Sequence, residues 1–223
     1  SKSFAQSDAA VQHYVLETFH PEDSVLLEIR DRAAREGLPN IHVGPMDGLH
    51  LEVIARSVGA RKIVEVGSLA GYSGVCLARA LPVGGKIYCL EYEPKHIEVA
   101  RESFEKAGLS DRVEFWAGSA LSSLPQIEKQ GPFDLVFIDA DKPGYPAYLD
   151  WTMDHLRVGG VVLGDNTFSG GRVADSAEVD HGAKTETVHA IRTFNQRVAA
   201  DLRFRATILP TGEGLTFAVK IKD

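Results

Sequence analysis

Two stretches decide the fold of this chain: Val136-Phe137-Ile138-Asp139-Ala140-Asp141-Lys142 and Val161-Val162-Leu163-Gly164-Asp165-Asn166. In each, a short apolar run ends abruptly in polar side chains. Such runs predict strands buried on both faces, as in a parallel sheet. Ligands bind beyond the carboxyl ends of the strands in an open parallel sheet, so the polar side chains of both stretches are expected at one edge. Two carboxylates and an amide there would suit magnesium, calcium or manganese.

The alternation of strand and helix extends over most of the chain. The patterns predict strands over 62–66, 86–91, 113–116, 133–138 and 161–163, with helices over 72–80, 94–107, 119–129 and 144–156 between them. Successive βα units of this kind predict a parallel sheet with right-handed crossovers. Helices are expected before it at 7–19, 22–36 and 46–58; after it come a polar loop at 171–183, a helix at 184–200, and strands at 203–209 and 214–221. The last two strands predict an antiparallel hairpin at one edge of a single α/β domain, residues 1–223.

Composition narrows the class of protein. The formal net charge of −7 argues against broad binding to a phosphate backbone, which needs clustered Lys and Arg. Cys76 and Cys89 belong to no CxxC pair and are read as buried free thiols, which fits a reducing, cytoplasmic location. No run of 18 apolar residues occurs, so we expect no transmembrane helix and no membrane partner.

A glycine-containing segment, residues 65–74, joins the first predicted strand to its helix. Its G-x3-G-x2-G spacing is not the G-x-G-x-x-G dinucleotide fingerprint, and a structural turn without a ligand is the alternative interpretation. Glu91 ends the next strand, where a carboxylate can accept both hydroxyls of a ribose. Together the loop and the acid predict a cofactor that contains a nucleoside. Ser119 and Ala120, just past the third strand, are expected to flank its adenine.

These motifs resemble those of a known family. Glu65-Val66-Gly67, Gly71-Tyr72-Ser73, Glu91, Asp139-Ala140-Asp141-Lys142 and Gly164-Asp165-Asn166 occur in the order found in the cation-dependent O-methyltransferases, which include the caffeoyl-CoA and catechol O-methyltransferases. The resemblance covers nearly the whole chain and implies a Rossmann-like sheet of seven strands in the order 3-2-1-4-5-7-6, with strand 7 antiparallel. It also implies S-adenosylmethionine as methyl donor and a divalent cation, usually magnesium.

The resemblance implies a role for each matching residue. Asp139, Asp165 and Asn166 match the metal ligands, and Lys142 matches a lysine beside the reacting hydroxyl, so Lys142 and Asp139 are the expected catalytic residues. Residues expected to contact the cofactor are Val43, Glu65, Gly67, Ser68, Tyr72, Ser73, Glu91, Ser119, Ala120, Asp139, Asp141 and Tyr148. The catechol enzyme has an acidic residue near its final strands that holds the second hydroxyl. Here no secure match exists, and Thr207 falls nearest.

The sequence therefore predicts a magnesium-dependent O-methyltransferase for a hydroxyl of a small catechol-like or hydroxycinnamoyl-type acceptor. Lys142 would act either as the general base or as a charged group that stabilises the phenolate. One alternative is a methyltransferase of the same fold that acts on a hydroxylated tRNA uridine. A nicotinamide-dependent oxidoreductase would need the missing fingerprint, and a non-catalytic binder would leave the lysine–carboxylate group without a use.

Two surface features leave further predictions. Val11, Tyr14 and Phe19 give the first helix an apolar stripe, which would cover the site or form the contact of a homodimer. A basic region near the last helix is interpreted as a solvated face, with contact to an anionic substrate as the alternative; it consists of Arg192, Arg197, Arg203 and Arg205.

Overall fold

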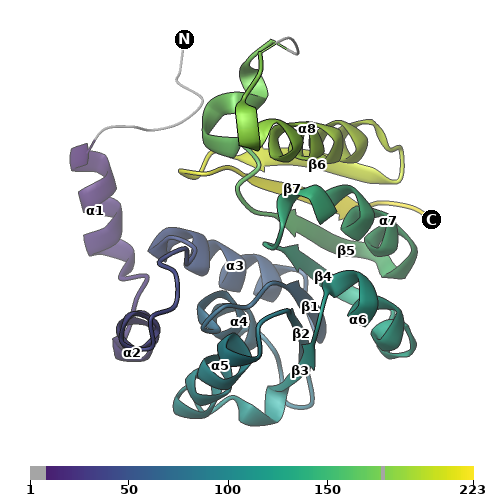
Figure 1. Ribbon diagram of the computed structural model, residues 1–223. Helices are drawn as coiled ribbons and strands as arrows, with labels where there is room; N and C mark the ends of the chain where they lie inside the picture. Colours follow the sequence, from purple (N-terminus) through teal and green to yellow (C-terminus); the bar gives the residue numbers. More distant parts are fainter. Residues whose placement is uncertain (1–8, 177–178) are drawn as a thin grey trace.

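A computed structural model describes residues 9–176 and 179–223. Its sheet is built from β1 (Lys62–Val66), β2 (Lys86–Glu91), β3 (Val113–Ala117), β4 (Phe133–Ile138), β5 (Leu156–Gly164), β6 (Phe204–Leu209) and β7 (Leu215–Lys220). These form one seven-stranded sheet in the order β3-β2-β1-β4-β5-β7-β6 (Figure 1). Strand β7 is antiparallel to both β5 and β6, and the other neighbours are parallel. The predicted fold class and strand order are confirmed.

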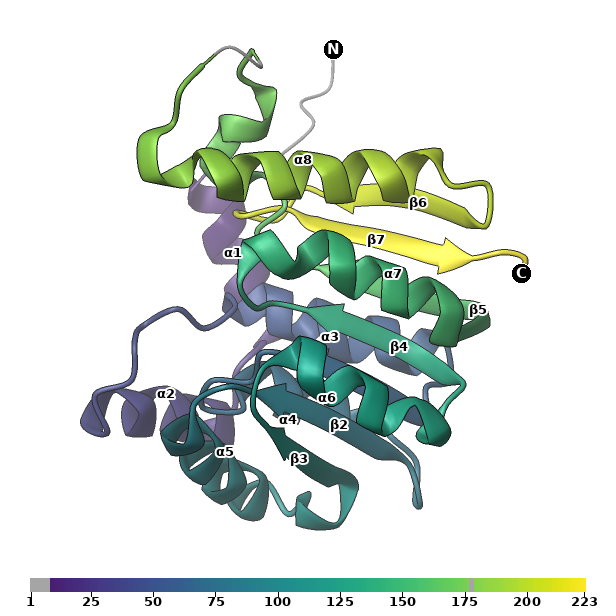
Figure 2. The ribbon, with the colours of Figure 1, turned by 45° about the vertical axis from the view of Figure 1, so that its right-hand side comes forward.

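Helices cover both faces of the sheet because its strands are apolar on both faces. They are α1 (Ala9–Phe19), α2 (Ser24–Arg35), α3 (Pro45–Ser57), α4 (Tyr72–Arg79), α5 (Pro94–Lys106), α6 (Ala120–Ile127), α7 (Tyr145–His155) and α8 (Thr185–Ala200). Alternate residues of β1 face opposite layers: Ile63 packs in the core with α2 to α5, and Val64 packs with α6 to α8. Figure 2 shows α6, α7 and α8 side by side on the near face of the sheet.

Two predicted elements differ from the observed ones. β5 begins at Leu156, well before the predicted start at 161, because Leu156 pairs with Phe133 of β4. Gly159 and Gly160 carry no side-chain pattern, so the sequence alone places no strand before residue 161. The predicted loop at 171–183 contains short 3-10 turns, at Ser169–Ala174 and Gly182–Lys184. In residues 9–176 and 179–223, no helix has both the length and the apolar character needed to cross a membrane.

Candidate active site

The glycine loop, defined here as residues 67–71, passes very close to the end of β4. Gly67 has φ +91°, and a Cβ placed on it would lie 2.2 Å from the carbonyl oxygen of Asp139. Only glycine combines this backbone conformation with this close approach. Oε2 of Glu91, at the end of β2, accepts hydrogen bonds from the backbone N–H groups of Ser68 and Leu69, each 2.9 Å long. The loop is therefore held from both neighbouring strands.

Glu65 supports the glycine loop from below. Its carboxylate is fully buried and accepts hydrogen bonds from Oγ of Ser68 (2.8 Å), Oγ of Ser73 (2.6 Å) and Sγ of Cys89 (3.1 Å). Burial raises the pKa of Glu65 to about 7, although these three hydrogen bonds act in the opposite direction. Ser68 belongs to the loop and Ser73 to the first turn of α4, so Glu65 ties the loop to the start of this helix.

A cavity of about 1010 Å³ opens at the carboxyl edge of the sheet. This volume lies at the upper end of the range for ligand pockets and leaves room for a cofactor and a small second substrate. Most residues predicted for the site line it: Val43, Gly67, Ser68, Tyr72, Ser73, Glu91, Ser119, Ala120, Asp139, Asp141, Lys142, Tyr148 and Asn166. Glu65 and Asp165 lie behind the cavity wall instead.

One end of the cavity is acidic and is called here the acidic end: Asp139, Lys142 and Asn166, which line the cavity, and Asp165, which is buried next to Asn166. Nζ of Lys142 donates a 2.9 Å hydrogen bond to Oδ1 of Asp139. Burial, together with the charge of Asp139 nearby, raises the pKa of Asp165 to about 7. Asn166 has a left-handed backbone (φ 56°), and its N–H donates to Oδ1 of Asp165 at 2.7 Å. The predicted metal-ligating residues are thus brought together, with one ammonium group facing two carboxylates.

Tyr145 is a residue of this site that the sequence did not single out. Its side chain is fully buried, and its hydroxyl accepts a 2.8 Å hydrogen bond from Nζ of Lys142. The same hydroxyl donates toward the carbonyl oxygens of Ile138 (3.0 Å) and Asp165 (2.9 Å). Tyr145 therefore connects the ends of β4 and β5 and holds Lys142 in place. The sequence could have suggested this contact, because Tyr145 stands three residues after Lys142 at the start of a predicted helix.

Tyr148 forms the wall next to Asp141. Its hydroxyl donates a short hydrogen bond of 2.5 Å to Oδ1 of Asp141, whose other oxygen accepts from the N–H of Gly144 at 3.0 Å. Gly144 is required here, because a Cβ at this position would lie 2.5 Å from the ring of Tyr148. Asp141 is thus oriented by two partners from the following turn and helix.

Glu213 is the second residue that the sequence did not single out. It lies in the turn between β6 and β7 and lines the cavity, whereas Thr207 lies within β6 and does not. The carbonyl oxygens of Glu213 and Gly214 accept hydrogen bonds from the backbone N–H groups of Phe168 and Thr167, so the turn is fixed beside the end of β5. An acid in the turn that joins the last two strands was the signal in the sequence.

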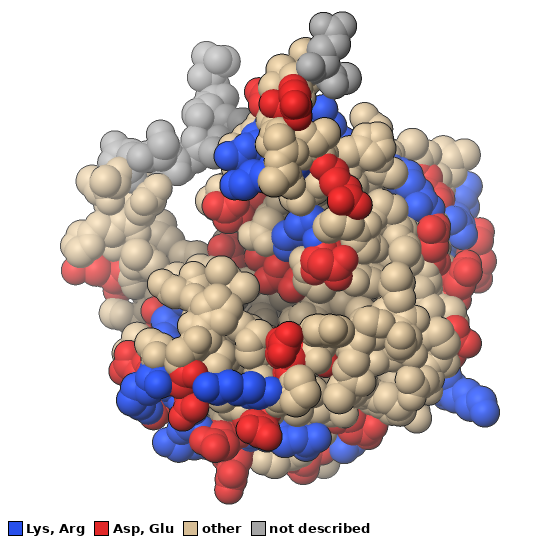
Figure 3. Space-filling view, viewed as in Figure 1, with Lys and Arg blue, Asp and Glu red and all other residues tan. Residues whose placement is uncertain are grey.

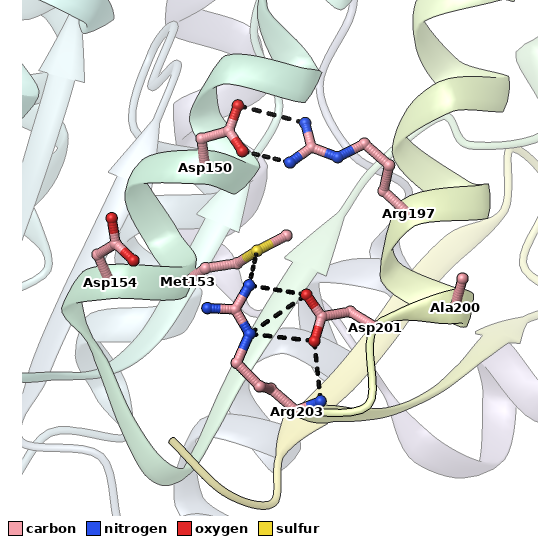
Figure 4. Close-up of a pocket in the computed structure, with 7 residues that line it drawn as sticks. All are labelled: Asp150, Met153, Asp154, Arg197, Ala200, Asp201 and Arg203. Carbon is pink, nitrogen blue, oxygen red and sulfur yellow. Dashed lines mark hydrogen bonds and ion pairs between the residues drawn. The ribbon is translucent and has the colours of Figure 1, made fainter.

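In residues 9–176 and 179–223, the lining of the cavity includes no arginine of the basic region near α8, and two of the four arginines of that region form ion pairs. Arg197 forms an ion pair with Asp150, and Arg203 forms one with Asp201, around a hollow of about 410 Å³ (Figure 4). These pairs favour the interpretation as a solvated face. On the face seen in Figure 3, blue and red side chains are interspersed, and the described residues form no continuous basic surface there.

Comparisons with known proteins agree with this geometry. A family model for O-methyltransferases matches residues 16–221. The catechol O-methyltransferase of Niastella koreensis is 39% identical over 202 residues, 90% of this chain and 89% of that protein. Caffeoyl-CoA O-methyltransferase 1 of Eucalyptus globulus is 32% identical over 228 residues, covering 99% and 92%. The solved O-methyltransferase from Bacillus cereus, in complex with SAH, has a TM-score of 0.87 at 41% identity, covering 95% of this chain and 97% of that chain.

The sheet order, the glycine loop and the acid at the end of β2 define a methyltransferase of the Rossmann-like class. The chain belongs to the O-methyltransferase family that contains the bacterial catechol and plant caffeoyl-CoA enzymes. It is an S-adenosylmethionine-dependent O-methyltransferase.

Proposed function

We propose that this enzyme transfers the methyl group to one hydroxyl of a small catechol-like or hydroxycinnamoyl-type acceptor, assisted by a divalent cation, most simply magnesium. One observation carries the proposal: the acidic end of the cavity lies directly beside the glycine loop. Gly67 and Asp139 approach so closely that no side chain fits between them. An acceptor held at the acidic end would therefore lie next to a donor held over the loop.

The residues of the acidic end fit a divalent cation. Asp139, Asp165 and Asn166 would hold it, since carboxylate and amide oxygens are the ligands that magnesium prefers. Burial, and after it the charge of Asp139, raises the pKa of Asp165 to about 7, and a bound cation would offset both effects. When bound, the cation would favour ionisation of a phenol, whose ordinary pKa is about 10.

The remaining work belongs to the chain's own residues. Lys142 donates to Asp139 and to Tyr145, and these two contacts place its amino group at the acidic end, where its charge would stabilise a phenolate. Glu91, which also lines the cavity, would accept the ribose hydroxyls of the donor. Holding the acceptor oxygen in line with the methyl carbon and the departing sulfur supplies about 7–11 kcal/mol of the rate enhancement. S-adenosylmethionine itself provides the electrophilic methyl group.

Further lining residues of the cavity support the acceptor class. Glu213, in the turn between β6 and β7, supplies a carboxylate to the lining that would accept a hydrogen bond from a second, neighbouring hydroxyl. Ile41 and Leu121 also line the cavity and are exposed at its rim, which suits an aromatic ring or an apolar chain. The two relatives named above act, by their names, on acceptors of this kind.

The proposal is tested by methyl transfer from labelled donor to a catechol, caffeoyl-CoA and bulk tRNA, with magnesium or with EDTA. We expect transfer to the small phenols, loss of activity in EDTA, and no label in tRNA. Asp165→Ala should reduce magnesium-dependent turnover at least 100-fold and weaken magnesium binding measured by calorimetry. The control is Asp154→Ala, an exposed aspartate on α7 outside the cavity. Near wild-type turnover by Asp165→Ala would overturn the metal assignment, and labelled tRNA would overturn the acceptor class.

We further propose that α1 contributes to a homodimer contact. None of the residues of α1 is buried, and Tyr14 and Phe19 are 63% and 59% exposed. A helix of 11 residues is marginally stable in water unless its apolar face packs against something. Light scattering should give twice the chain mass for the wild type and a lower mass for Tyr14→Ser/Phe19→Ser. A monomeric wild type at micromolar concentration would refute the dimer.

A further inference from the structure

A cluster of polar side chains ties α2 to the loop at 38–44 and to the start of α4. It is called here the Arg30 cluster: Glu22, Arg30, Val43 and Tyr72. Oε1 of Glu22 accepts hydrogen bonds from Nε of Arg30 (2.5 Å) and from the hydroxyl of Tyr72 (2.8 Å). The second arm of the Arg30 guanidinium donates to the carbonyl oxygen of Val43 at 2.8 Å. The guanidinium also lies 4.2 Å above the centre of the Tyr72 ring, within cation–π range.

The cluster is largely withdrawn from solvent. The side chains of Arg30 and Glu22 are 25% and 18% exposed, and Tyr72 is 1% exposed. Burial, with the charge of Arg30 nearby, lowers the pKa of His42 to about 4. At neutral pH His42 is therefore uncharged, and Arg30 supplies the positive charge that balances Glu22.

Two members of the cluster also form the cavity wall, because Val43 and Tyr72 both line it. The carbonyl group of Val43 is held by Arg30, while its N–H has no acceptor among the described residues. A backbone N–H that is left open beside a fixed carbonyl can donate to an anionic group of a ligand without further ordering. Such preorganisation improves affinity because the entropy of fixing the loop is lost in folding rather than in binding.

We propose that Arg30 is a positioning residue that sets the affinity for S-adenosylmethionine by holding the Val43 backbone against the cavity. Arg30 touches neither the acceptor nor the methyl group and acts through Val43 and Tyr72. The inference rests on the proposed contact between the cofactor and Val43. It goes beyond that contact because it states that a residue of α2, a helix that precedes all the strands of the sheet, sets the position of the Val43 backbone.

Arginine is specifically required because its planar fork reaches Glu22 and Val43 at once. Lysine keeps the charge opposite Glu22 but, as a point charge on a flexible stem, does not reproduce the two-armed contact. Arg30→Lys should therefore keep the fold and lose the positioning. Arg30→Gln should lose both the ion pair and the positioning.

The test measures binding of SAH by calorimetry, without metal or acceptor, together with KM for S-adenosylmethionine and kcat. Both Arg30 variants should bind SAH about 10–50-fold more weakly, with KM raised similarly and kcat at saturating donor within threefold of wild type. Hydrogen exchange in the segment 38–44 should accelerate. The matched control is Arg35→Gln on the same helix, whose ion pair with Glu28 is exposed; it should bind SAH like the wild type.

A purely structural anchor gives a different result. In that case Arg30→Lys binds SAH within twofold of wild type and only the melting temperature changes, which overturns the inference. Glu91→Gln separates this failure from failure of the cofactor placement. If Glu91→Gln weakens SAH binding and Arg30→Lys does not, only the role of Arg30 is wrong. If neither variant changes SAH binding, the placement of the cofactor in this cavity is wrong as well.

Discussion

Gly67→Ala tests the contact that joins the glycine loop to the acidic end. The new Cβ would lie 2.2 Å from the carbonyl oxygen and 2.9 Å from the carbonyl carbon of Asp139, so backbone must move by about 1 Å to reach normal contact. A non-glycine residue in left-handed backbone costs about 1–2 kcal/mol. Overpacking of a tight contact adds about 1–3 kcal/mol. We therefore expect a loss of roughly 2–5 kcal/mol in the free energy of unfolding.

A matched control separates the two contributions. Gly84 has a similar positive φ (+78°), but nothing lies within 4 Å of a Cβ placed on it. Gly84→Ala should therefore show only the backbone contribution of about 1–2 kcal/mol. For a chain of this size each kcal/mol lowers the melting temperature by about 2–4 °C. The additional loss in Gly67→Ala should then be about 2–12 °C in a thermal scan.

The functional consequence follows from which atom is displaced. The atom that must move belongs to Asp139, so the same substitution disturbs the glycine loop and a proposed metal ligand. Gly67→Ala should weaken both SAH binding and magnesium binding, each measured by calorimetry, whereas Gly84→Ala should change neither. The reasoning would be refuted if Gly67→Ala melted within 2 °C of Gly84→Ala and turned over substrate at the wild-type rate. The close contact between Gly67 and Asp139 would then contribute nothing to stability or activity.

Three further substitutions test single contacts. Tyr145→Phe should lower stability by about 1–3 kcal/mol in urea and reduce kcat, because it removes the hydroxyl that holds Lys142; unchanged values of both would contradict this. Gly144→Ala should displace the Tyr148 ring and weaken SAH binding about 5–150-fold, equivalent to the loss of one hydrogen bond of about 1–3 kcal/mol; an unchanged calorimetric affinity would contradict this. Burial raises the pKa of Glu65 from 4.5 to about 7, so its contribution to stability is full below pH 4.5 and is lost as the pH rises through 7. Between pH 5 and 8 the free energy of unfolding of the wild type should therefore fall by about 1–3 kcal/mol more than that of Glu65→Gln, as measured in denaturation curves. The same pH dependence in both proteins would contradict a raised pKa for Glu65.

Much of the fold could be predicted because most of its strands have a recognisable sequence pattern of their own. β1 and β4 are short runs of buried apolar residues, and such runs identify themselves without knowledge of their neighbours. β5 could not be bounded in this way. Its first residue, Leu156, has no strand pattern around it and joins the strand because it pairs with Phe133 of β4; residues 157–160 form an irregularity before regular pairing resumes between Val161 and Leu135. Pairing between strands distant in the sequence overrides the local pattern there.

The Arg30 cluster shows a second limit of sequence reasoning. Glu22, Arg30, Val43 and Tyr72 come from four separate places in the chain, and no spacing rule relates them. Each is unremarkable where it stands: an acid before a helix, an arginine on that helix, a valine in a loop and a tyrosine at a helix start. Their meeting depends on how α2 packs against α4 and α5, which hydrophobic patterning leaves open.

The sequence could predict that the residues after β1, β4 and β5 lie close together, and the register of the sheet explains why. Val66 of β1 pairs with Ile138 of β4, and Ile138 pairs with Gly164 of β5, so these strands end at the same level. The backbone continues the ladder by one more step, since the N–H of Asp139 donates to Val66 and the N–H of Asp165 donates to Ile138.

Whatever residue follows each of these strands is therefore placed beside the residue that follows the next one. The residues that follow β1, β4 and β5 are Gly67, Asp139 and Asp165, and they therefore form one row across the edge of the sheet. Their proximity needs no long-range prediction beyond the strand order. Glu213 reaches the cavity on a turn, and Arg30 lies on a helix and acts on the cavity wall through Val43. No strand register dictates the position of this turn or this helix, so only the structure supplied these two residues.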